Sequence, residues 1–349
     1  MNSNEKKPLL TFALFAYNQE KFIREAVEGA LAQTYSPLEI IFSDDCSTDR
    51  TFEIIEEMVA GYRGPHRIVL NKNTRNLGLC AHVNKVFGLA SGSWIVMAAG
   101  DDISLPNRCD ELAEAIKRNP NAVAVSSAWQ LIDEESGCLE TFLPDRFARG
   151  RIDRHGSFEW CKKFSKGKSI GVLGASSMWA KKLAVHFGPI ASEVPAEDSV
   201  LNFRAYLTGD VVYLPELLIR YRSHSGNING VMDDDLVSIE ARKAKFAERN
   251  LATLTQIEQD FKCYVETCNR GVGSSEVSQF LRLSSSNLNT TISWWNRDSW
   301  WRFMKVVEAL RQGNWTAFRW RLVRLGSMTL FVKMTNIKRR LFGKYLWCR

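Results

Sequence analysis

The sequence lacks the two glycine-rich loops through which many proteins hold a nucleotide with backbone amides. No GxGxxG follows the first apolar run, and no GxxxxGK[ST] occurs anywhere in the 349 residues. Diphosphate binding by backbone amides at a helix N-terminus is therefore not supported. A nucleotide site in this chain would have to use other groups.

The sequence also lacks closely spaced cysteines and long apolar runs. Its eight cysteines are scattered without a CxxC pair, which argues against a zinc site. No run reaches the about 18 apolar residues that span a bilayer. No secretory signal precedes the first apolar run, so we expect reduced thiols and a cytoplasmic location.

The first 130 residues alternate short β-like runs with amphipathic helical segments. Strands are expected at 9–16, 38–43, 66–70, 94–98 and 122–128, and helices between them. This alternation predicts an α/β fold with a mostly parallel sheet and helices on both faces. We expect one α/β domain over 1–230, a helical extension over 231–270, and a basic, Trp-rich helical C-terminal region over 271–349.

Polar residues follow three of the expected strands. Tyr17 comes after the first strand, Asp44-Asp45 after the second and Asp101-Asp102 after the fourth. The carboxyl ends of parallel strands meet at one edge of the sheet, where ligands bind. Converging carboxylates repel unless a cation compensates them, and Mg²⁺ or Mn²⁺ would also bind a diphosphate. The alternative is that these acids only cap helices or solvate loops.

These residues belong to a series of motifs that resembles the opening of family 2 glycosyltransferases. The series runs through 15–18, 31–35, 39–51, 76–78 and 100–102, in the family's order and at similar spacing. The resemblance covers about residues 8 to 230. It implies a GT-A fold, an inverting transfer of a sugar from a nucleotide sugar, and the type of enzyme that builds bacterial cell-surface polysaccharides.

On the donor side, the resemblance implies that Tyr17 and Asp45 contact the nucleotide base, with Asp45 accepting a hydrogen bond from a pyrimidine imino group. Of Asp101 and Asp102, one would ligate Mn²⁺ or Mg²⁺ and the other would contact the ribose or the metal shell, with Asp102 favoured as the metal ligand. The chain departs from the family pattern at Ala99, where an acidic residue is common.

On the acceptor side, Glu197-Asp198 resembles the family's Glu-Asp pair, so Asp198 is the expected general base and Glu197 a substrate-binding residue. The alternative is an acidic first turn that only stabilises the helix dipole. His224 resembles a position that approaches the metal and diphosphate, beside Arg222 as a substrate contact; the alternative is a surface histidine. The small-residue stretch 171–177 is expected to shape the acceptor pocket.

The excess positive charge lies at the C-terminal end. From Arg297 onward there are thirteen Lys and Arg but two acidic residues, interleaved with tryptophans. This pattern favours an anionic membrane surface as partner, at the inner face of the cell membrane. The alternative is a helical subdomain that packs on the catalytic domain, and nucleic acid is not an expected partner.

The sequence therefore predicts an enzyme that transfers a hexosyl or deoxyhexosyl group from a UDP- or dTDP-sugar to a saccharide hydroxyl, with a lipid-linked acceptor in polysaccharide synthesis. Two alternatives are a nucleotidyltransferase, which also uses carboxylate-bound Mg²⁺, and a non-catalytic module that binds nucleotide sugars or glycans.

Overall fold

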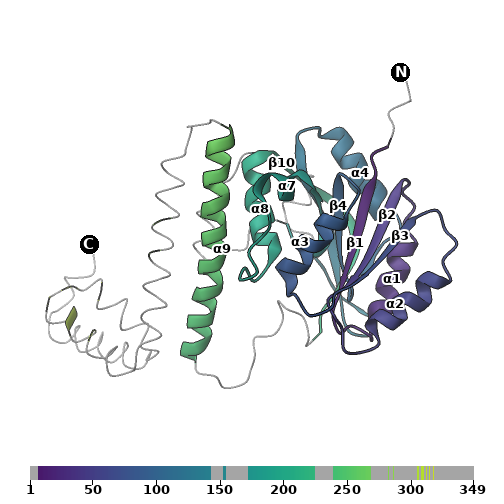
Figure 1. Ribbon diagram of the computed structural model, residues 1–349, viewed down its shortest axis with the longest axis horizontal. Coiled ribbons are helices and arrows are strands. Elements are labelled where there is room, and N and C mark those ends of the chain that lie inside the picture. The colour runs from purple at the N-terminus through teal and green to yellow at the C-terminus, as the bar shows by residue number, and fades with distance from the viewer. Residues whose placement is uncertain are drawn as a thin grey trace. The chain divides into compact units, whose positions relative to one another are not determined.

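The computed structural model describes residues 7–142, 152–154, 172–224 and 239–268, with side chains of the last segment from 250 onward, and a few single positions beyond it (Figure 1). The chain divides into two units: Met1–Met232 with Ala252–Ser284, and Asp233–Leu251 with Ser285–Arg349. The sheet and the candidate site belong to the first unit. Apart from those single positions, the predicted Trp-rich membrane region lies outside the described residues, and the three-part domain division stays a prediction.

In the part of the chain that the structure describes, ten strands form one sheet, with the bounds β1 Leu10–Ala16, β2 Leu38–Asp44, β3 Arg67–Lys72, β4 Trp94–Ala99, β5 Ile103–Ser104, β6 Ala122–Ile132, β7 Cys138–Phe142, β8 Ile152–Arg154, β9 Ser177–Ala180 and β10 Asp210–Arg222. The helices are α1 Ile23–Leu31, α2 Thr51–Ala60, α3 Leu79–Leu89, α4 Arg108–Arg118, α7 Lys182–Phe187, α8 Glu197–Thr208 and α9 Ile239–Cys268, with a short 3₁₀ turn, η1, at Gly174–Ser176. Among the described residues, no helix is long and apolar enough to cross a bilayer.

The strand order β3-β2-β1-β4-β9-β6-β10-β5 joins two halves of different character. Strands β3, β2, β1 and β4 are parallel, as the β-α alternation predicts. Strand β9 then runs antiparallel between β4 and β6, and β6 pairs in parallel with β10. The predicted parallel arrangement therefore holds for the first half, while antiparallel pairs outnumber parallel ones in the second.

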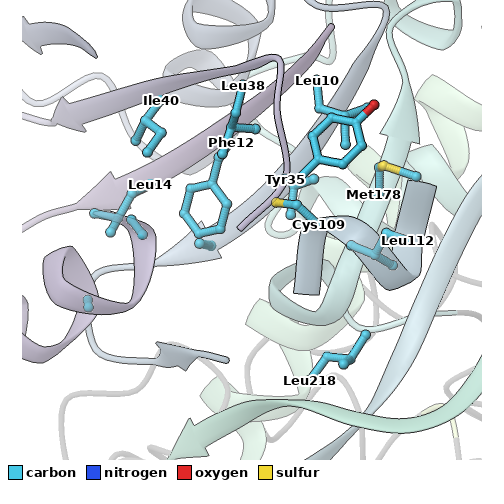
Figure 2. Packing of buried hydrophobic residues seen from close by; sticks show 14 of the residues in the cluster. Leu10, Phe12, Leu14, Tyr35, Leu38, Ile40, Cys109, Leu112, Met178 and Leu218 are labelled. Atoms are coloured by element: carbon cyan, nitrogen blue, oxygen red, sulfur yellow. The ribbon is translucent and has the colours of Figure 1, made fainter. Parts of the chain in front are cut away.

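Helices cover both faces of the sheet, as predicted (Figure 1). Alternate residues of β1, including Phe12 and Leu14, pack with buried residues of α1, α2 and α4 in one cluster. Figure 2 shows Leu10, Phe12 and Leu14 beside Leu38 and Ile40 of β2 and Cys109 and Leu112 of α4. On the opposite face, Phe15 of β1 meets His82 of α3 edge-on, with 5.2 Å between ring centroids. Burial on both faces explains why β1 is apolar along almost its whole length.

A buried ion pair attaches the C-terminal half of α9 to α8. Arg204 of α8 donates from Nε to Oδ2 of Asp260 at 2.7 Å and from Nη2 to Oδ1 at 3.1 Å, and neither side chain is more than 1% exposed. Arg204 Nη1 also donates to the Gly188 carbonyl at 2.9 Å. Arg204 therefore ties α8 both to α9, through Asp260, and to the chain that precedes α8, through Gly188. These contacts fix the position of the α8 N-terminus.

Candidate functional site

A cavity of about 750 Å³ opens at the carboxyl ends of the parallel strands. Its wall includes residues that follow β1, β2 and β4, together with η1 and the first turn of α8. Of the sequence-predicted site residues, the cavity brings together Tyr17, Asp45, Asp101, Asp102, Glu197, Asp198 and His224. Arg222 is the one predicted site residue that is absent from this wall.

The loop after β1 is locked to the loop after β2 by Asn18. Its backbone lies in the left-handed region, at φ 51°, which asparagine tolerates better than most residues. The Asn18 amide donates to Ser47 Oγ at 2.9 Å, and Asn18 Oδ1 accepts from the Thr48 amide at 2.8 Å. Tyr17, 45% exposed, is thereby held at the edge of the cavity.

The two acids after β2 have different surroundings. Asp44 accepts from the amide and the hydroxyl of Ser47, which is the local capping role that the sequence left open. Asp45 lines the cavity and accepts three hydrogen bonds, from Asn73 Nδ2 at 2.7 Å and from the amides of Leu77 at 2.9 Å and Gly78 at 3.0 Å. Asp45 therefore orders the loop before α3 while facing the cavity.

The acidic turn after β4 holds a carboxylate oxygen without a partner. Asp102 Oδ1 accepts from the Arg222 amide at 2.9 Å, whereas Asp102 Oδ2 is buried and has no hydrogen-bond partner. Burial, reinforced by the charge of Asp101, raises the pKa of Asp102 well above its ordinary value. A buried carboxylate with a free oxygen is short of positive charge, so its chemistry suits a cation.

His224 lies against this turn. Its Nε2 is 2.9 Å from Asp101 Oδ2, and its ring packs on Phe22 with 4.7 Å between centroids. The surface-histidine alternative does not describe this position, because the side chain is 10% exposed and lines the cavity. Metal ligation by His224 stays a prediction, and the described residues contain no group of three or more His, Cys, Asp or Glu side chains that could hold a metal ion.

Arg222 has a different place from the one predicted. It is fully buried, and its guanidinium donates to the carbonyls of Asp101, Asp133 and Glu134 at 2.9 to 3.0 Å. It also pairs with the Glu25 carboxylate at 3.1 Å. These bonds tie the acidic turn to α1 and to the 133–136 turn. The geometry gives Arg222 a positioning role instead of the predicted direct substrate contact.

The first turn of α8 places two more carboxyl groups at the cavity. Burial, reinforced by Asp198, raises the pKa of Glu197 to about 8, and burial also raises the pKa of Asp198. A Cβ on Gly174 would lie 2.5 Å from Glu197 Oε1, so the glycine makes room for this carboxyl group. The predicted role of the small-residue stretch is consistent with Leu173, Gly174 and Ala175 in the cavity wall.

Among the polar cavity residues that sequence reasoning missed are His82 and Tyr221. His82 lies one helical turn after Gly78, a spacing that puts it on the same side of α3 as the loop bound by Asp45. Tyr221 immediately precedes Arg222, and its hydroxyl has no partner among the described residues. Burial raises the pKa of Tyr221, so the hydroxyl stays protonated at neutral pH.

The sheet order and the acid-lined cavity at the strand ends define a GT-A fold. The sequence model of "Glycosyl transferase family 2" matches residues 11–149. An uncharacterized glycosyltransferase of Rickettsia typhi is 30% identical over 260 residues, which cover 71% of this chain and 74% of the relative. The chain belongs to glycosyl transferase family 2, as the sequence motifs indicate.

Two solved structures share the fold. Residues 1–349 of Staphylococcus aureus TarS in complex with UDP-GlcNAc superpose with a TM-score of 0.56 at 16% identity, covering 89% of both chains. A mannosyltransferase of Pyrobaculum calidifontis in complex with GDP-Man and Mn²⁺ gives a TM-score of 0.51 at 16% identity, covering 94% of this chain and 89% of that one. The chain spans 60% of the length of uncharacterized proteins of Mycobacterium bovis and Mycobacterium tuberculosis that are 27% identical to it.

Proposed function

We propose that this protein transfers a sugar from a nucleoside-diphosphate sugar to an acceptor hydroxyl, with inversion at the anomeric carbon. The observation that carries the proposal is one cavity that joins Asp45, Asp101 and Asp102 at the strand ends to Glu197 and Asp198 on α8. The family membership and the two GT-A structures that hold nucleotide sugars support the same activity.

The surroundings of Asp45 favour a pyrimidine base in the donor. An ionised carboxylate offers about four lone-pair sites, and protein donors already use three of those on Asp45. One site remains, on Oδ2, which suits the single imide N–H of uracil or thymine. Guanine would present two neighbouring N–H groups and leave one unpaired. A UDP- or dTDP-sugar is therefore the donor that we propose, with Tyr17 at the edge of the base site and Asp101 on the ribose.

The acidic turn fits a divalent cation, Mn²⁺ or Mg²⁺. Asp102 Oδ2 is the buried oxygen that lacks a partner, and His224 lies beside the same turn. Asp102 and His224 would hold the ion from the protein side, leaving other positions for diphosphate oxygens and water. When bound, the ion stabilises the negative charge of the leaving diphosphate. Ala99 adds no carboxylate to this set, so the protein contributes few ligands of its own.

Asp198 is the proposed general base. It accepts the proton of the acceptor hydroxyl as that oxygen bonds to the anomeric carbon, while the bond from this carbon to the diphosphate oxygen breaks. A pKa raised by burial brings Asp198 closer to neutral, which makes the carboxylate a stronger base. Glu197, whose pKa is about 8, keeps its proton at neutral pH and can donate a hydrogen bond to the acceptor.

The acceptor that we propose is a saccharide hydroxyl on a lipid-linked precursor of a cell-surface polysaccharide. The basic, Trp-rich residues from 294 to 344 support this part, because such a segment would bind the anionic inner face of the cell membrane. A variant without residues 271–349 should lose binding to phosphatidylserine liposomes in a sedimentation assay. Unchanged binding would refute the membrane part alone.

The activity is tested by incubating UDP- and dTDP-sugars with Mn²⁺ and a panel of saccharide acceptors, and measuring released nucleoside diphosphate and glycosylated product. Asp198→Asn should lower kcat by a factor of about 10² to 10⁴ with unchanged UDP affinity. Asp110→Asn, on α4 and outside the cavity wall, is the control and should transfer normally. Normal transfer by Asp198→Asn would refute its role as base.

Nucleotide-sugar binding without nucleoside diphosphate release would indicate a binding module, and pyrophosphate release from a nucleoside triphosphate would indicate a nucleotidyltransferase.

A further inference from the structure

A buried histidine on α3 faces the donor side of the cavity. His82 is 3% exposed and belongs to the cavity wall. Its Nε2 lies 2.6 Å from Ser43 Oγ, and its ring contacts Phe15 edge-on. The mechanism proposed above assigns it no role.

The hydrogen bonds around Ser43 determine which nitrogen of His82 carries the proton. Ser43 is fully buried, and its Oγ accepts from Asn71 Nδ2 at 2.8 Å. The Ser43 hydroxyl has one hydrogen, and His82 Nε2 is its only acceptor among the described residues. A buried hydroxyl hydrogen without an acceptor is costly, so Nε2 accepts it. Burial lowers the pKa of His82, so the ring is neutral and its proton is on Nδ1.

The protonated nitrogen is open to the cavity. Within the part of the chain that the structure describes, Nδ1 of His82 has no hydrogen-bond partner. It is not among the side-chain atoms that are both buried and unpaired, whereas Nδ1 of His66 is one of them. An N–H donor on an otherwise buried ring therefore reaches the cavity.

A chain of hydrogen bonds connects His82 to the base-reading carboxylate. Beyond Ser43 it continues from Asn71 Nδ2 to Asn73 Oδ1 at 3.1 Å, and from Asn73 Nδ2 to Asp45 Oδ1 at 2.7 Å. The Asp45 charge also acts directly on the His82 ring. The cavity thus presents a fixed acceptor, Asp45, and a fixed donor, His82, near each other and held by one network.

We propose that His82 donates a hydrogen bond from Nδ1 to the O4 carbonyl of the donor's base, next to the N3–H that Asp45 accepts. This inference rests on the proposed function and adds a residue that sets base selectivity. The donor and acceptor pair matches the adjacent C=O and N–H of uracil or thymine. Cytosine presents a lone pair at N3 and an amino group in place of the O4 carbonyl, so it would oppose both groups.

The test compares UDP and CDP, each with Mn²⁺, by isothermal titration calorimetry on the full chain. The ribose, diphosphate and metal contacts are common to both nucleotides and cancel in the ratio of their Kd values. His82→Phe should weaken UDP binding by a factor of about 5 to 20, the loss of one hydrogen bond, and leave CDP almost unchanged. His82→Gln keeps an N–H donor and should retain most of the preference for UDP. His66→Phe is the matched loss of a buried histidine outside the cavity wall and should leave the ratio unaltered.

A variant-free measurement covers the case in which His82→Phe does not fold. In nitrogen-15 histidine spectra of the wild-type protein, His82 should carry its proton on Nδ1, and this resonance should shift on addition of UDP. The signal is assigned by its absence from His82→Gln. Equal weakening of UDP and CDP in the variants, or a protonated Nε2 in the spectra, would overturn the inference while leaving the transferase proposal standing. If the wild type bound neither nucleotide, both proposals would fall.

Discussion

The ion pair between α8 and α9 gives a quantitative prediction, because it is buried on both sides. Asp260→Asn preserves the shape of the side chain but removes its charge, so the Arg204 guanidinium stays buried without a carboxylate partner. Breaking a buried pair in this way costs about 3–5 kcal/mol, since the remaining charge is desolvated and uncompensated. We expect the free energy of unfolding to fall by that amount.

A second ion pair on the same helix provides the control. Glu258 and Lys262 are 3.3 Å apart, with side chains 31% and 64% exposed. Glu258→Gln should therefore cost about 0.3–0.5 kcal/mol, as for other exposed pairs of this spacing. Urea unfolding followed by circular dichroism measures both variants, with the shift read from the midpoint at constant slope.

The double variant Arg204→Met/Asp260→Leu tests the same reasoning by removing both charges of the buried pair. Replacing both charges by apolar side chains should cost much less than Asp260→Asn alone, because no buried charge is left. The reasoning would be refuted if the costs of Asp260→Asn and Glu258→Gln agreed within about 0.5 kcal/mol, or if the double variant cost as much as Asp260→Asn. Because Arg204 lies on the helix that begins with Glu197-Asp198, Asp260→Asn should also reduce kcat more than it weakens UDP binding.

Two further predictions concern the carboxyl groups of α8. Gly174→Ala should reduce the transfer rate several-fold, because the new Cβ would lie 2.5 Å from Glu197 Oε1. Gly61→Ala, whose Cβ would have its nearest contact at 3.6 Å, is the control and should transfer normally. Equal steady-state rates for the two variants would show that the Glu197 carboxyl group moves aside freely. The pKa of Glu197 is about 8 in the folded protein, against an ordinary value of 4.5. Between pH 4.5 and 8 the folded state therefore holds a proton that the unfolded state has lost. The free energy of unfolding should fall as the pH rises through this range. Glu197→Gln should flatten this decline in urea unfolding series, and an unchanged slope would exclude Glu197 as its source.

The parallel half of the sheet could be predicted because its signals are local. Strands β1, β2 and β3 are each followed directly by a helix, as the β-α alternation predicts. Strand β9 could not be predicted, because the four residues Ser177–Ala180 become a strand only by filling the gap between β4 and β6. Strand β10 continues through Pro215, where no amide can join the ladder, and its pairing with β6 shifts register there.

The candidate site shows the same division between local and distant information. The sequence motifs identified Asp45, Asp101, Asp102 and Asp198, and all four line one cavity in the structure. It could not separate Asp44 from Asp45, because that difference depends on which donors each side chain meets. It also misplaced Arg222, whose acceptors come from α1, the acidic turn and the 133–136 turn, segments that only the folded chain brings together.

The position of β9 has a consequence for biosynthesis. On a ribosome, β1 to β4 and then β6 emerge well before Ser177–Ala180, the segment that lies between them in the sheet. Until it arrives, β4 and β6 each present an open edge that can pair with another nascent chain. Translation that stalls before residue 180 should therefore yield fragments that aggregate through these edges, whereas chains that extend through β10, the other neighbour of β6, have both edges of β6 paired.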